Sequence, residues 1–187
     1  IGTVAGLYLL DRDSGDYQYI AMPVESSYIN TLYQSADGLL YIGTNGSGVL
    51  TYDHRNKNFV HYYTGNCALV SNNIYTILPE MDGCIIMSTE DGITSFQIKD
   101  KTFHNRTSEQ GLLSACFNPS SGTLCRNGGF VLGSTDGAVE FPEKLRFPTY
   151  VYKKMILSDF QISYQPVYPG DEDSPLEKDI NETQVLK

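Results

Sequence analysis

The chain has 187 residues, of which 41% are hydrophobic and 19% charged, and its formal net charge is −9 at pH 7. A chain of this length can bury a sizeable hydrophobic core. The negative charge argues against binding to a phosphate backbone, because such binding needs Lys and Arg side chains gathered on one face. We therefore expect no nucleic-acid partner.

Similar segments recur along the chain with a period of about 45 residues, a length typical of one β-propeller blade. Residues 37–53 read DGLLYIGTNGSGVLTYD, residues 82–98 read DGCIIMSTEDGITSFQI, and residues 128–142 read GGFVLGSTDGAVEFP. A shorter copy of the same pattern, a Gly-Thr pair followed by a Gly and an apolar residue, occurs at Gly2-Thr3 and Gly6-Leu7. This self-similarity predicts a repeat architecture, and the chain begins in the middle of a unit.

The elements predicted in chain order are short strands joined by Asp-Gly and Gly-rich turns, the pattern of consecutive β-hairpins. Residues 11–16 are expected to form a turn in the first unit, since a calcium loop would need Gly at its sixth position and Glu at its twelfth. The strands expected in the second and third units lie at 29–34, 39–43, 49–52, 59–63, 74–78, 84–88, 93–96 and 101–106. In the fourth unit Phe117 begins the first strand late, and we expect the extra residues to form a turn at 118–122.

The repeat pattern ends after Gly137, and Pro142 and Pro148 mark the exit from the array, since proline is poorly tolerated in a central strand. From Met155 onward the sequence predicts one or two strands, then a turn-rich stretch and a further strand around 184–186. We therefore predict an all-β fold: about three and a half four-stranded blades of a β-propeller over residues 1–148, then a junction and the first strands of a second β domain over 149–187. An open arc of blades would expose apolar faces, so we expect a piece of a larger protein.

No residue pattern predicts catalysis, a cofactor or a metal in this piece. The four cysteines lack the spacing of a metal site, and Cys84 is expected to be a buried thiol in a strand. A disulfide between Cys116 and Cys125, which flank the turn expected at 118–122, and two unpaired thiols are both open. The three histidines lie in turns or outer strands, without a second ligand at metal spacing: His54, His61 and His104.

The order of motifs resembles the two-component-regulator propeller repeat. The resemblance rests on the run Leu69-x-Ser71-Asn72-Asn73-Ile74, then Asp82-Gly83 and Ser88-Thr89-x-x-Gly92-Ile93, and, in the fourth unit, Glu109-Gln110-Gly111-Leu112, Phe117-Asn118 and Gly133-Ser134-x-x-Gly137. The tail, with Pro169-Gly170 and Ser174-Pro175-Leu176, resembles the start of the triple-tyrosine domain, an immunoglobulin-like β-sandwich. The chain departs from the family where a Trp is common, carrying Tyr41, Ile86 and Val131 instead.

The resemblance implies the extracytoplasmic sensor of a hybrid two-component histidine kinase and response regulator. Residues 1–148 would be the C-terminal blades of a propeller in the periplasmic part of an inner-membrane protein. The ligand would be a glycan-derived oligosaccharide, the full-length protein a homodimer with kinase activity, and the output transcription of glycan-utilisation genes. Two alternatives stay open: a propeller enzyme, such as a lyase or glycosidase, with its active site on other blades, and a protein-interaction scaffold.

In propellers, the turn between the second and third strands of a blade emerges on the same face as the connections between blades. Donor and acceptor side chains on this face would suit sugar hydroxyl groups, and tyrosines could stack on a pyranose ring; the same Asn and Asp side chains could equally serve only their own turns. The candidate ligand-binding residues are Thr44, Asn45, Asn72, Asn73, Thr89, Glu90, Thr135, Asp136, Tyr28 and Tyr75.

Overall fold

The computed structural model describes residues 1–80, 83–141, 159–171 and 174–182. The chain divides into two compact units, Ile1–Phe147 and Pro148–Lys187. Across the described residues, strands and turns make up the structure apart from one 3₁₀ helix, Ser108–Gln110. The all-β prediction is confirmed. None of the described helical residues forms a segment long and apolar enough to cross a membrane.

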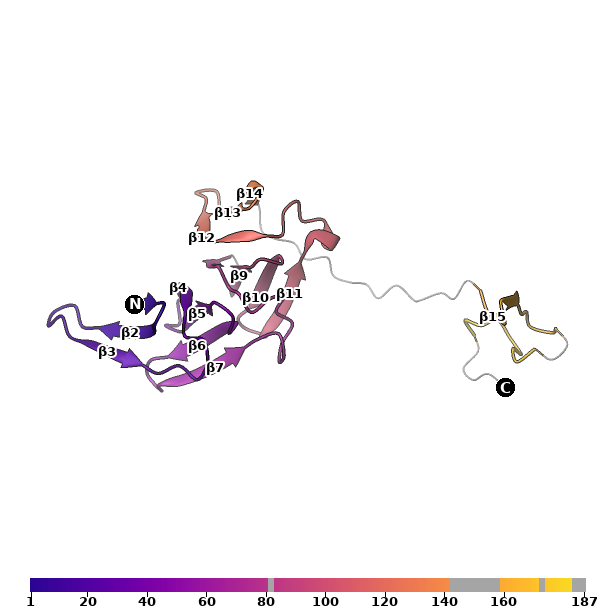
Figure 1. Ribbon diagram of the computed structural model, residues 1–187, viewed down its shortest axis with the longest axis horizontal. Coiled ribbons are helices and arrows are strands. Elements are labelled where there is room, and N and C mark those ends of the chain that lie inside the picture. Colours follow the sequence, from indigo (N-terminus) through magenta and orange to yellow (C-terminus); the bar gives the residue numbers. More distant parts are fainter. Residues whose placement is uncertain (81–82, 142–158, 172–173, 183–187) are drawn as a thin grey trace. The chain divides into compact units, whose positions relative to one another are not determined.

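The first unit contains four antiparallel sheets in chain order (Figure 1), and each strand pairs with its neighbour in the sequence. The first sheet consists of β1 (Gly2–Thr3), β2 (Gly6–Leu10) and β3 (Tyr17–Ile20). The second consists of β4 (Ile29–Gln34), β5 (Leu40–Thr44), β6 (Val49–Asp53) and β7 (Asn58–Tyr62). The third consists of β8 (Thr76–Pro79), β9 (Cys84–Ser88), β10 (Ile93–Gln97) and β11 (Thr102–Arg106). The fourth consists of β12 (Phe117–Leu124), β13 (Phe130–Ser134) and β14 (Gly137–Phe141).

The second and third sheets are complete four-stranded blades, as the repeat predicts. By the shorter copy of the Gly-Thr pattern, β1 corresponds to β5, so the first sheet begins at the second strand of a blade. The turn predicted at residues 11–16 joins β2 to β3, and the Asp11 carboxylate accepts hydrogen bonds from the Asp13 and Ser14 amides at 2.9 and 3.1 Å. The partial propeller is confirmed, and the exit at 142–148 lies outside the described residues.

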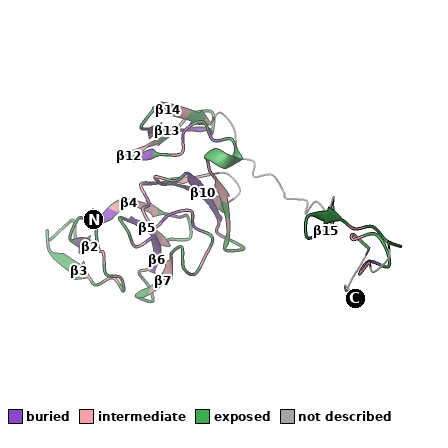
Figure 2. Cartoon of the chain, turned by 45° about the vertical axis from the view of Figure 1, so that its right-hand side comes forward, coloured by how far each residue is buried: buried purple, intermediate pink, exposed green. Residues whose placement is uncertain are grey.

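The hydrophobic core lies between successive blades, because side chains alternate across each strand. On β5, Ile42 packs towards the first sheet with Leu7 and Leu50, whereas Tyr41 packs towards the third sheet with Ile77. On β9 the pattern repeats: Ile85 and Met87 face the second sheet, and Ile86 faces the fourth sheet with Phe117, Phe130 and Leu132. The buried residues follow these middle strands (Figure 2). Each blade therefore depends on its neighbours for burial of its apolar faces.

The extra residues of the fourth unit do not form the turn predicted at 118–122. They lie inside β12, where the pairing with β13 shifts register between Phe117 and Gly122. The prediction is wrong because tertiary contacts hold this bulge against the inner strands. The Ser120 amide donates to the Tyr75 carbonyl at 3.2 Å, and the Ser120 hydroxyl donates to the Asn30 carbonyl at 3.4 Å. The bulge therefore ties the fourth blade to the second and third.

The cysteines resolve the alternative left open by the sequence. Cys116 and Cys125 are free thiols, the first exposed and the second half-buried. Cys84 is also half-buried, not buried as predicted, because it begins β9 beside the exposed Gly83.

Tyr41 occupies the position where the resembling family often has Trp, and it is only 2% exposed. Its ring lies 6.2 Å from that of Phe96, between the second and third blades. Burial raises the pKa of Tyr41 to about 12, with a smaller contribution from the nearby Asp37 carboxylate. The folded state thus favours the neutral phenol.

We expect Tyr41 to make the protein sensitive to strong base. A group whose folded pKa is raised from 10.0 to about 12 contributes stability that is complete below pH 10 and is lost as the pH rises through that interval. The urea midpoint should therefore fall more steeply between pH 9 and pH 11.5 in the wild type than in Tyr41→Phe. Parallel falls in the two proteins would show that Tyr41 ionises as freely when folded as when unfolded.

In the second unit, the described residues form a small hairpin of β15 (Gln161–Ile162) and β16 (Gln165–Pro166). Ser163 and Tyr164 form its turn with φ values of 51° and 65°. Leu176 is 4% exposed. The strand predicted at 184–186 lies outside the described residues, and the assignment of 149–187 to an immunoglobulin-like sandwich stays a prediction.

Candidate functional site

One face of the first unit collects the turns β5–β6, β9–β10 and β13–β14 and the segments that lead into β4, β8 and β12; we name it the loop face. Backbone hydrogen bonds join each turn to these segments. The Ile74 amide donates to the Thr44 carbonyl at 2.9 Å, and the Phe117 amide donates to the Thr89 carbonyl at 3.1 Å. The Asn45 amide donates to the Tyr28 carbonyl at 2.9 Å. The loop face is therefore a continuous hydrogen-bonded surface.

Two of the predicted binding residues, Thr44 and Thr89, are fully buried and close their own turns. The Thr44 hydroxyl donates to the Gly48 carbonyl at 2.7 Å, and the Thr89 hydroxyl donates to the Gly92 carbonyl at 3.0 Å. Ser134 does the same for Gly137 at 3.0 Å in the fourth blade. A Thr or Ser followed three or four residues later by Gly thus recurs because each blade needs this turn, and these hydroxyl groups do not face a ligand.

We expect Thr89→Val to destabilise the fold by about 1–3 kcal/mol, because the isosteric valine leaves the Asp91 amide without its acceptor and removes the bond to Gly92. Urea denaturation of the chain would measure this difference. Thr135→Val is the matched control: Thr135 occupies the next turn, but its side chain is exposed. Equal stability of the two variants would contradict a structural role for the Thr89 hydroxyl.

A series of serines, which sequence reasoning missed, fastens the loop face from outside the turns. Ser26 donates to the Asn45 carbonyl at 2.8 Å, and Ser71 donates to Glu90 Oε1 at 2.7 Å. Ser114 donates to Asp136 Oδ2 at 2.9 Å. Their spacing in the sequence follows the blade period, always two residues after an apolar residue, as in Leu69-x-Ser71. That spacing was the signal that could have found them.

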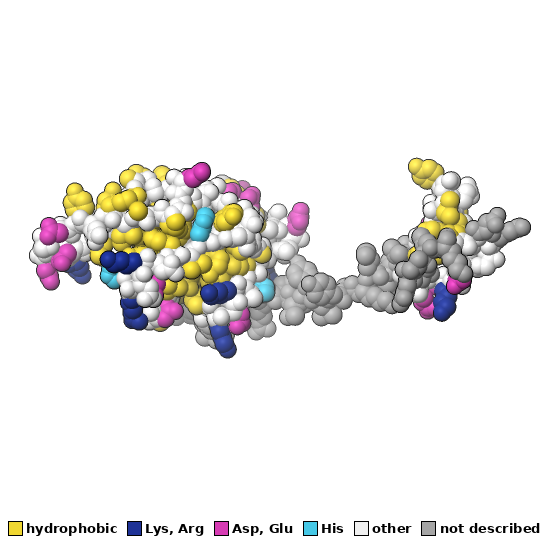
Figure 3. Space-filling model, turned by 90° about the horizontal axis from the view of Figure 1, so that it is seen from below, with side chains coloured by type: hydrophobic (Ala, Val, Ile, Leu, Met, Phe, Trp, Pro, Cys, Tyr) yellow, Lys and Arg dark blue, Asp and Glu magenta, His cyan; other side chains and the backbone are white. Residues whose placement is uncertain are grey.

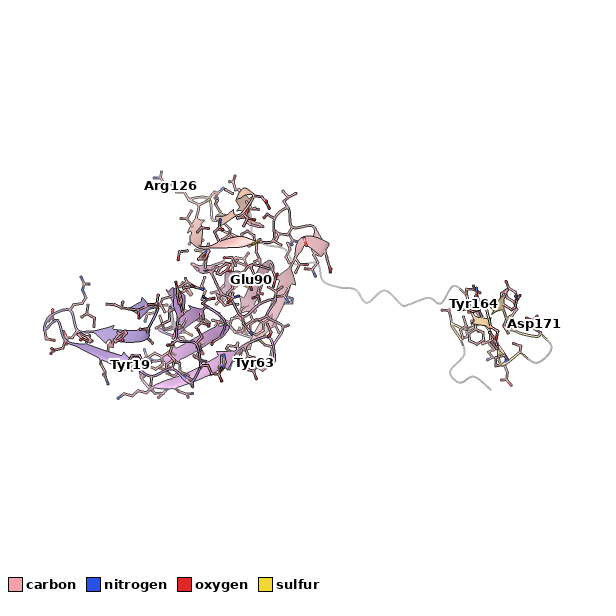
Figure 4. The ribbon with its side chains drawn as sticks, in the orientation of Figure 1. Tyr19, Tyr63, Glu90, Arg126, Tyr164 and Asp171 are labelled. Carbon is pink, nitrogen blue, oxygen red and sulfur yellow. The ribbon has the colours of Figure 1, made fainter. Side chains whose placement is uncertain are left out.

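Of the other predicted polar residues, some are hydrogen-bonded within the protein and others are exposed. Glu90 Oε1 also accepts from Asn73 Nδ2 at 2.7 Å, while Glu90 Oε2 is buried without a hydrogen-bond partner. Asn72 Oδ1 accepts from the Thr64 amide at 2.9 Å, and the Asn72 carbonyl accepts from the Gly48 amide at 2.8 Å. Figure 4 shows Glu90 at the turn after β9. These side chains are held in fixed positions.

Asn45, Thr135, Asp136 and Tyr28 are exposed on the loop face. Tyr75 is half-buried. Burial raises its pKa, and the negative charge of Glu90 makes a smaller contribution in the same direction. The Glu90 carboxylate thus lies near enough to Tyr75 to disfavour its ionised form. It does not bring Tyr75 together with Tyr28 in any recorded ring contact between described residues.

A hollow of about 430 Å³ opens beside the β5–β6 turn and the end of β7, in the second blade. Its lining comes from the segment before β4, the β5–β6 turn, the end of β7 and the segment before β8: Pro23, Val24, Glu25, Gly46, Ser47, His61, Tyr63 and Asn72. Of the predicted binding residues only Asn72 is among them. Sequence reasoning assigned His61 to an outer strand, which is confirmed, but no signal in the sequence pointed to a hollow beside it.

The walls of the hollow are well fixed. His61 Nε2 donates to the Ser47 carbonyl at 2.6 Å, and the His61 ring stacks on Tyr63 with centroids 4.9 Å apart. Tyr63, which Figure 4 labels beyond the end of β7, is anchored through its backbone: its amide donates to Asn66 Oδ1 at 2.9 Å and its carbonyl accepts from the Cys67 amide at 3.1 Å. Glu25 is the one acidic side chain in the lining, which contains no Lys or Arg.

The chemistry available on the loop face is binding by hydrogen bonds and aromatic contact. Among the described residues, no group of three or more His, Cys, Asp or Glu side chains could hold a metal ion.

Seen from the side of the outer strands (Figure 3), apolar side chains are interspersed with single Lys and Arg side chains. Val60 on β7 and Tyr19 on β3 are among the exposed ones.

The sequence pattern of the family described as "Two component regulator propeller" matches residues 23–46. "Histidine kinase P4" of Formosa agariphila is 22% identical over 197 residues, which cover 100% of this chain and 14% of the kinase. The chain thus spans a small part of that relative. Its resemblance to two-component regulator propellers is confirmed.

Solved structures share the fold. The extracellular domain of a putative hybrid two-component system from B. thetaiotaomicron superimposes with a TM-score of 0.64 at 21% identity, over 73% of this chain and 19% of that one. A second such domain from the same organism gives 0.60 at 17% identity, over 79% of this chain and 19% of that one. Virginiamycin B lyase from Staphylococcus aureus gives 0.51 at 12% identity, over 73% of this chain and 47% of the lyase. At these identities the likeness concerns the fold alone.

Proposed function

We propose that this chain, which carries a two-component regulator propeller repeat, is part of the sensor region of a hybrid two-component histidine kinase and response regulator. The region lies in the periplasm as part of an inner-membrane protein, and the full-length protein acts as a homodimer. Its ligand is an oligosaccharide derived from a glycan, and its output is transcription of glycan-utilisation genes. The blades described here contribute binding and transmission, and the kinase chemistry belongs to other domains.

The observation that carries this proposal is the construction of the loop face. Backbone and serine hydrogen bonds hold its turns rigid, while Asn45, Thr135 and Tyr28 remain exposed for a ligand. A prearranged set of neutral donors and acceptors suits sugar hydroxyl groups, because little side-chain freedom is lost on binding. The alignment of the whole chain with a histidine kinase supports the sensing role.

Signalling requires that the ligand favours one arrangement of the sensor over another, since a ligand shifts an equilibrium only by its difference in affinity for the two states. The covalent route from the blades towards the second unit runs through residues 142–158, which lie outside the described residues. We propose that this junction carries the change.

Binding of a glycan library to the intact extracytoplasmic region tests the function. We expect Asn45→Ala and Glu90→Ala each to weaken the best oligosaccharide by about tenfold, since Asn45→Ala removes an exposed hydrogen-bonding group and Glu90→Ala removes the acceptor that holds Ser71 and Asn73 in place. Calorimetric titration would measure this. Asn58→Ala is the matched control, because Asn58 is exposed at the start of β7, after the β6–β7 turn on the opposite side of the blade. If neither variant changes the affinity, the ligand binds elsewhere; if no glycan binds the intact region, the sensing proposal is wrong.

A further inference from the structure

We propose that the hollow beside His61 and Tyr63 binds a single uncharged sugar ring, and that Glu25 excludes acidic sugars from it. This inference rests on the sensing function proposed above and names one subsite of it, with its selectivity. It goes beyond the candidate residues found in the sequence, because only Asn72 of that set lines the hollow.

The size of the hollow suits one ring. Its volume of about 430 Å³ falls at the lower end of the range of roughly 300–1,000 Å³ that small-molecule sites occupy. A pyranose fits such a space with room for bridging water, whereas a long oligosaccharide would have to continue over the rest of the loop face. The turn residue Asn45 adjoins Gly46 and Ser47, so a longer ligand could run from the hollow onto the exposed residues of that face.

The polar groups of the hollow are those that recognise hydroxyl groups. Glu25 supplies carboxylate acceptors, and Ser47 supplies a hydroxyl that both donates and accepts. Asn72 Oδ1 already accepts a hydrogen bond from the Thr64 amide. The side-chain nitrogen of Asn72 is therefore the atom that would donate to a ligand. Ser47 is fixed at both ends, since its amide donates to Thr44 Oγ1 at 3.1 Å and its carbonyl accepts from His61. Rigid donors and acceptors lower the entropic cost of binding.

The apolar part of the lining suits the C–H faces of a sugar. Pro23 and Val24 line one side, and the stacked pair of His61 and Tyr63 lines another. Tyr63 is 39% exposed, so part of its ring remains available for contact. A ring with both apolar and hydroxylated surfaces matches this division, whereas a flat apolar molecule would leave Glu25, Ser47 and Asn72 without partners.

The charge of the hollow sets its selectivity. No Lys or Arg lines it, Glu25 is negative, and the chain as a whole carries a formal charge of −9. A carboxylate or sulfate on the ligand would approach the exposed Glu25 carboxylate without a compensating cation, and like charges repel. Uncharged hexoses are therefore favoured over uronic acids of the same shape.

The test uses the whole 187-residue chain at pH 7 and four probes: the methyl glycosides of glucose, galactose and mannose, and methyl glucuronide. Amide chemical shifts and saturation transfer in NMR report both binding and its place. We expect at least one of the neutral glycosides to shift the Ser47 and Asn72 amides, and methyl glucuronide to shift neither. Ser47→Ala and Tyr63→Ala should each weaken the neutral glycoside by about five- to tenfold, since each removes one contact without disturbing the backbone bonds around it.

Glu25→Gln separates the charge from the shape. This variant should admit methyl glucuronide, while Glu109→Gln, an exposed acidic residue on the 3₁₀ helix away from the lining, should not. The proposal is overturned if none of the neutral glycosides shifts residues of the hollow, or if the wild type binds the glucuronide as well as the neutral sugars. If the intact region binds an oligosaccharide and neither Ser47→Ala nor Tyr63→Ala alters its affinity, the hollow is not the subsite and the sensing function stands.

Discussion

Replacing Leu50 by alanine should destabilise the first unit by about 2–5 kcal/mol, the range seen when a large aliphatic side chain is removed from a packed core. Leu50 is 0% exposed and packs with Leu7, Ile42 and Tyr52 between the first and second sheets. The first sheet has three strands and buries its apolar face against the second. A cavity at Leu50 therefore loosens the contact on which the first sheet depends.

Leu113→Ala is the matched control, because the same chemical change occurs at a leucine that is 94% exposed. Its effect should stay within about 0.5 kcal/mol. Urea denaturation followed by tyrosine fluorescence measures both variants, as the chain has 14 Tyr and no Trp. In Leu50→Ala the turn at residues 11–16 should also be cleaved sooner by protease. Equal midpoints for the two variants would mean that the first and second sheets do not share a core.

The fold was largely predictable because its two strongest signals are local. Short alternating strands, recurring with a period of about 45 residues, predicted the four-stranded blades. The repeated turn, in which a Thr or Ser is followed three or four residues later by Gly, fixes the spacing between strands. Where the local signal was ambiguous, as at 118–122, the prediction was wrong: the bulge is held by Tyr75 and Asn30, which lie far away in the sequence.

The grouping of turns and connecting segments on one face was predictable, whereas the packing of their side chains was not. Sequence reasoning placed the connecting segments and turns on one face, and the hydrogen bonds between Tyr28 and Asn45 and between Asn72 and Gly48 show them together there. It could not tell that Thr44 and Thr89 turn inward, because a threonine in a turn looks the same whether its hydroxyl faces a ligand or its own backbone. The hollow was missed because Glu25, His61 and Asn72 come from three separate segments.

The glycine that ends each turn provides the sharpest comparison between blades. Gly92 and Gly137 have nearly the same backbone conformation, with φ values of +135° and +132°. A Cβ at Gly92 would lie 2.5 Å from the Arg106 carbonyl oxygen of β11, whereas a Cβ at Gly137 would have no described atom within 4 Å. The two positions therefore share the conformational strain of a side chain at positive φ and differ in the steric clash with an outer strand.

Gly137→Ala should thus cost about 1–3 kcal/mol, the penalty for a side chain in a sparsely populated backbone region. Gly92→Ala should cost at least about 2 kcal/mol more, because backbone atoms of β11 would have to move and overpacking of this kind is itself expensive. Urea denaturation gives both free energies, and amide exchange across Thr102–Arg106 should increase in Gly92→Ala alone. If the two variants lose the same stability, the clash with β11 adds nothing to the cost of a side chain at Gly92. Glycine would then recur at this position only because of its backbone conformation.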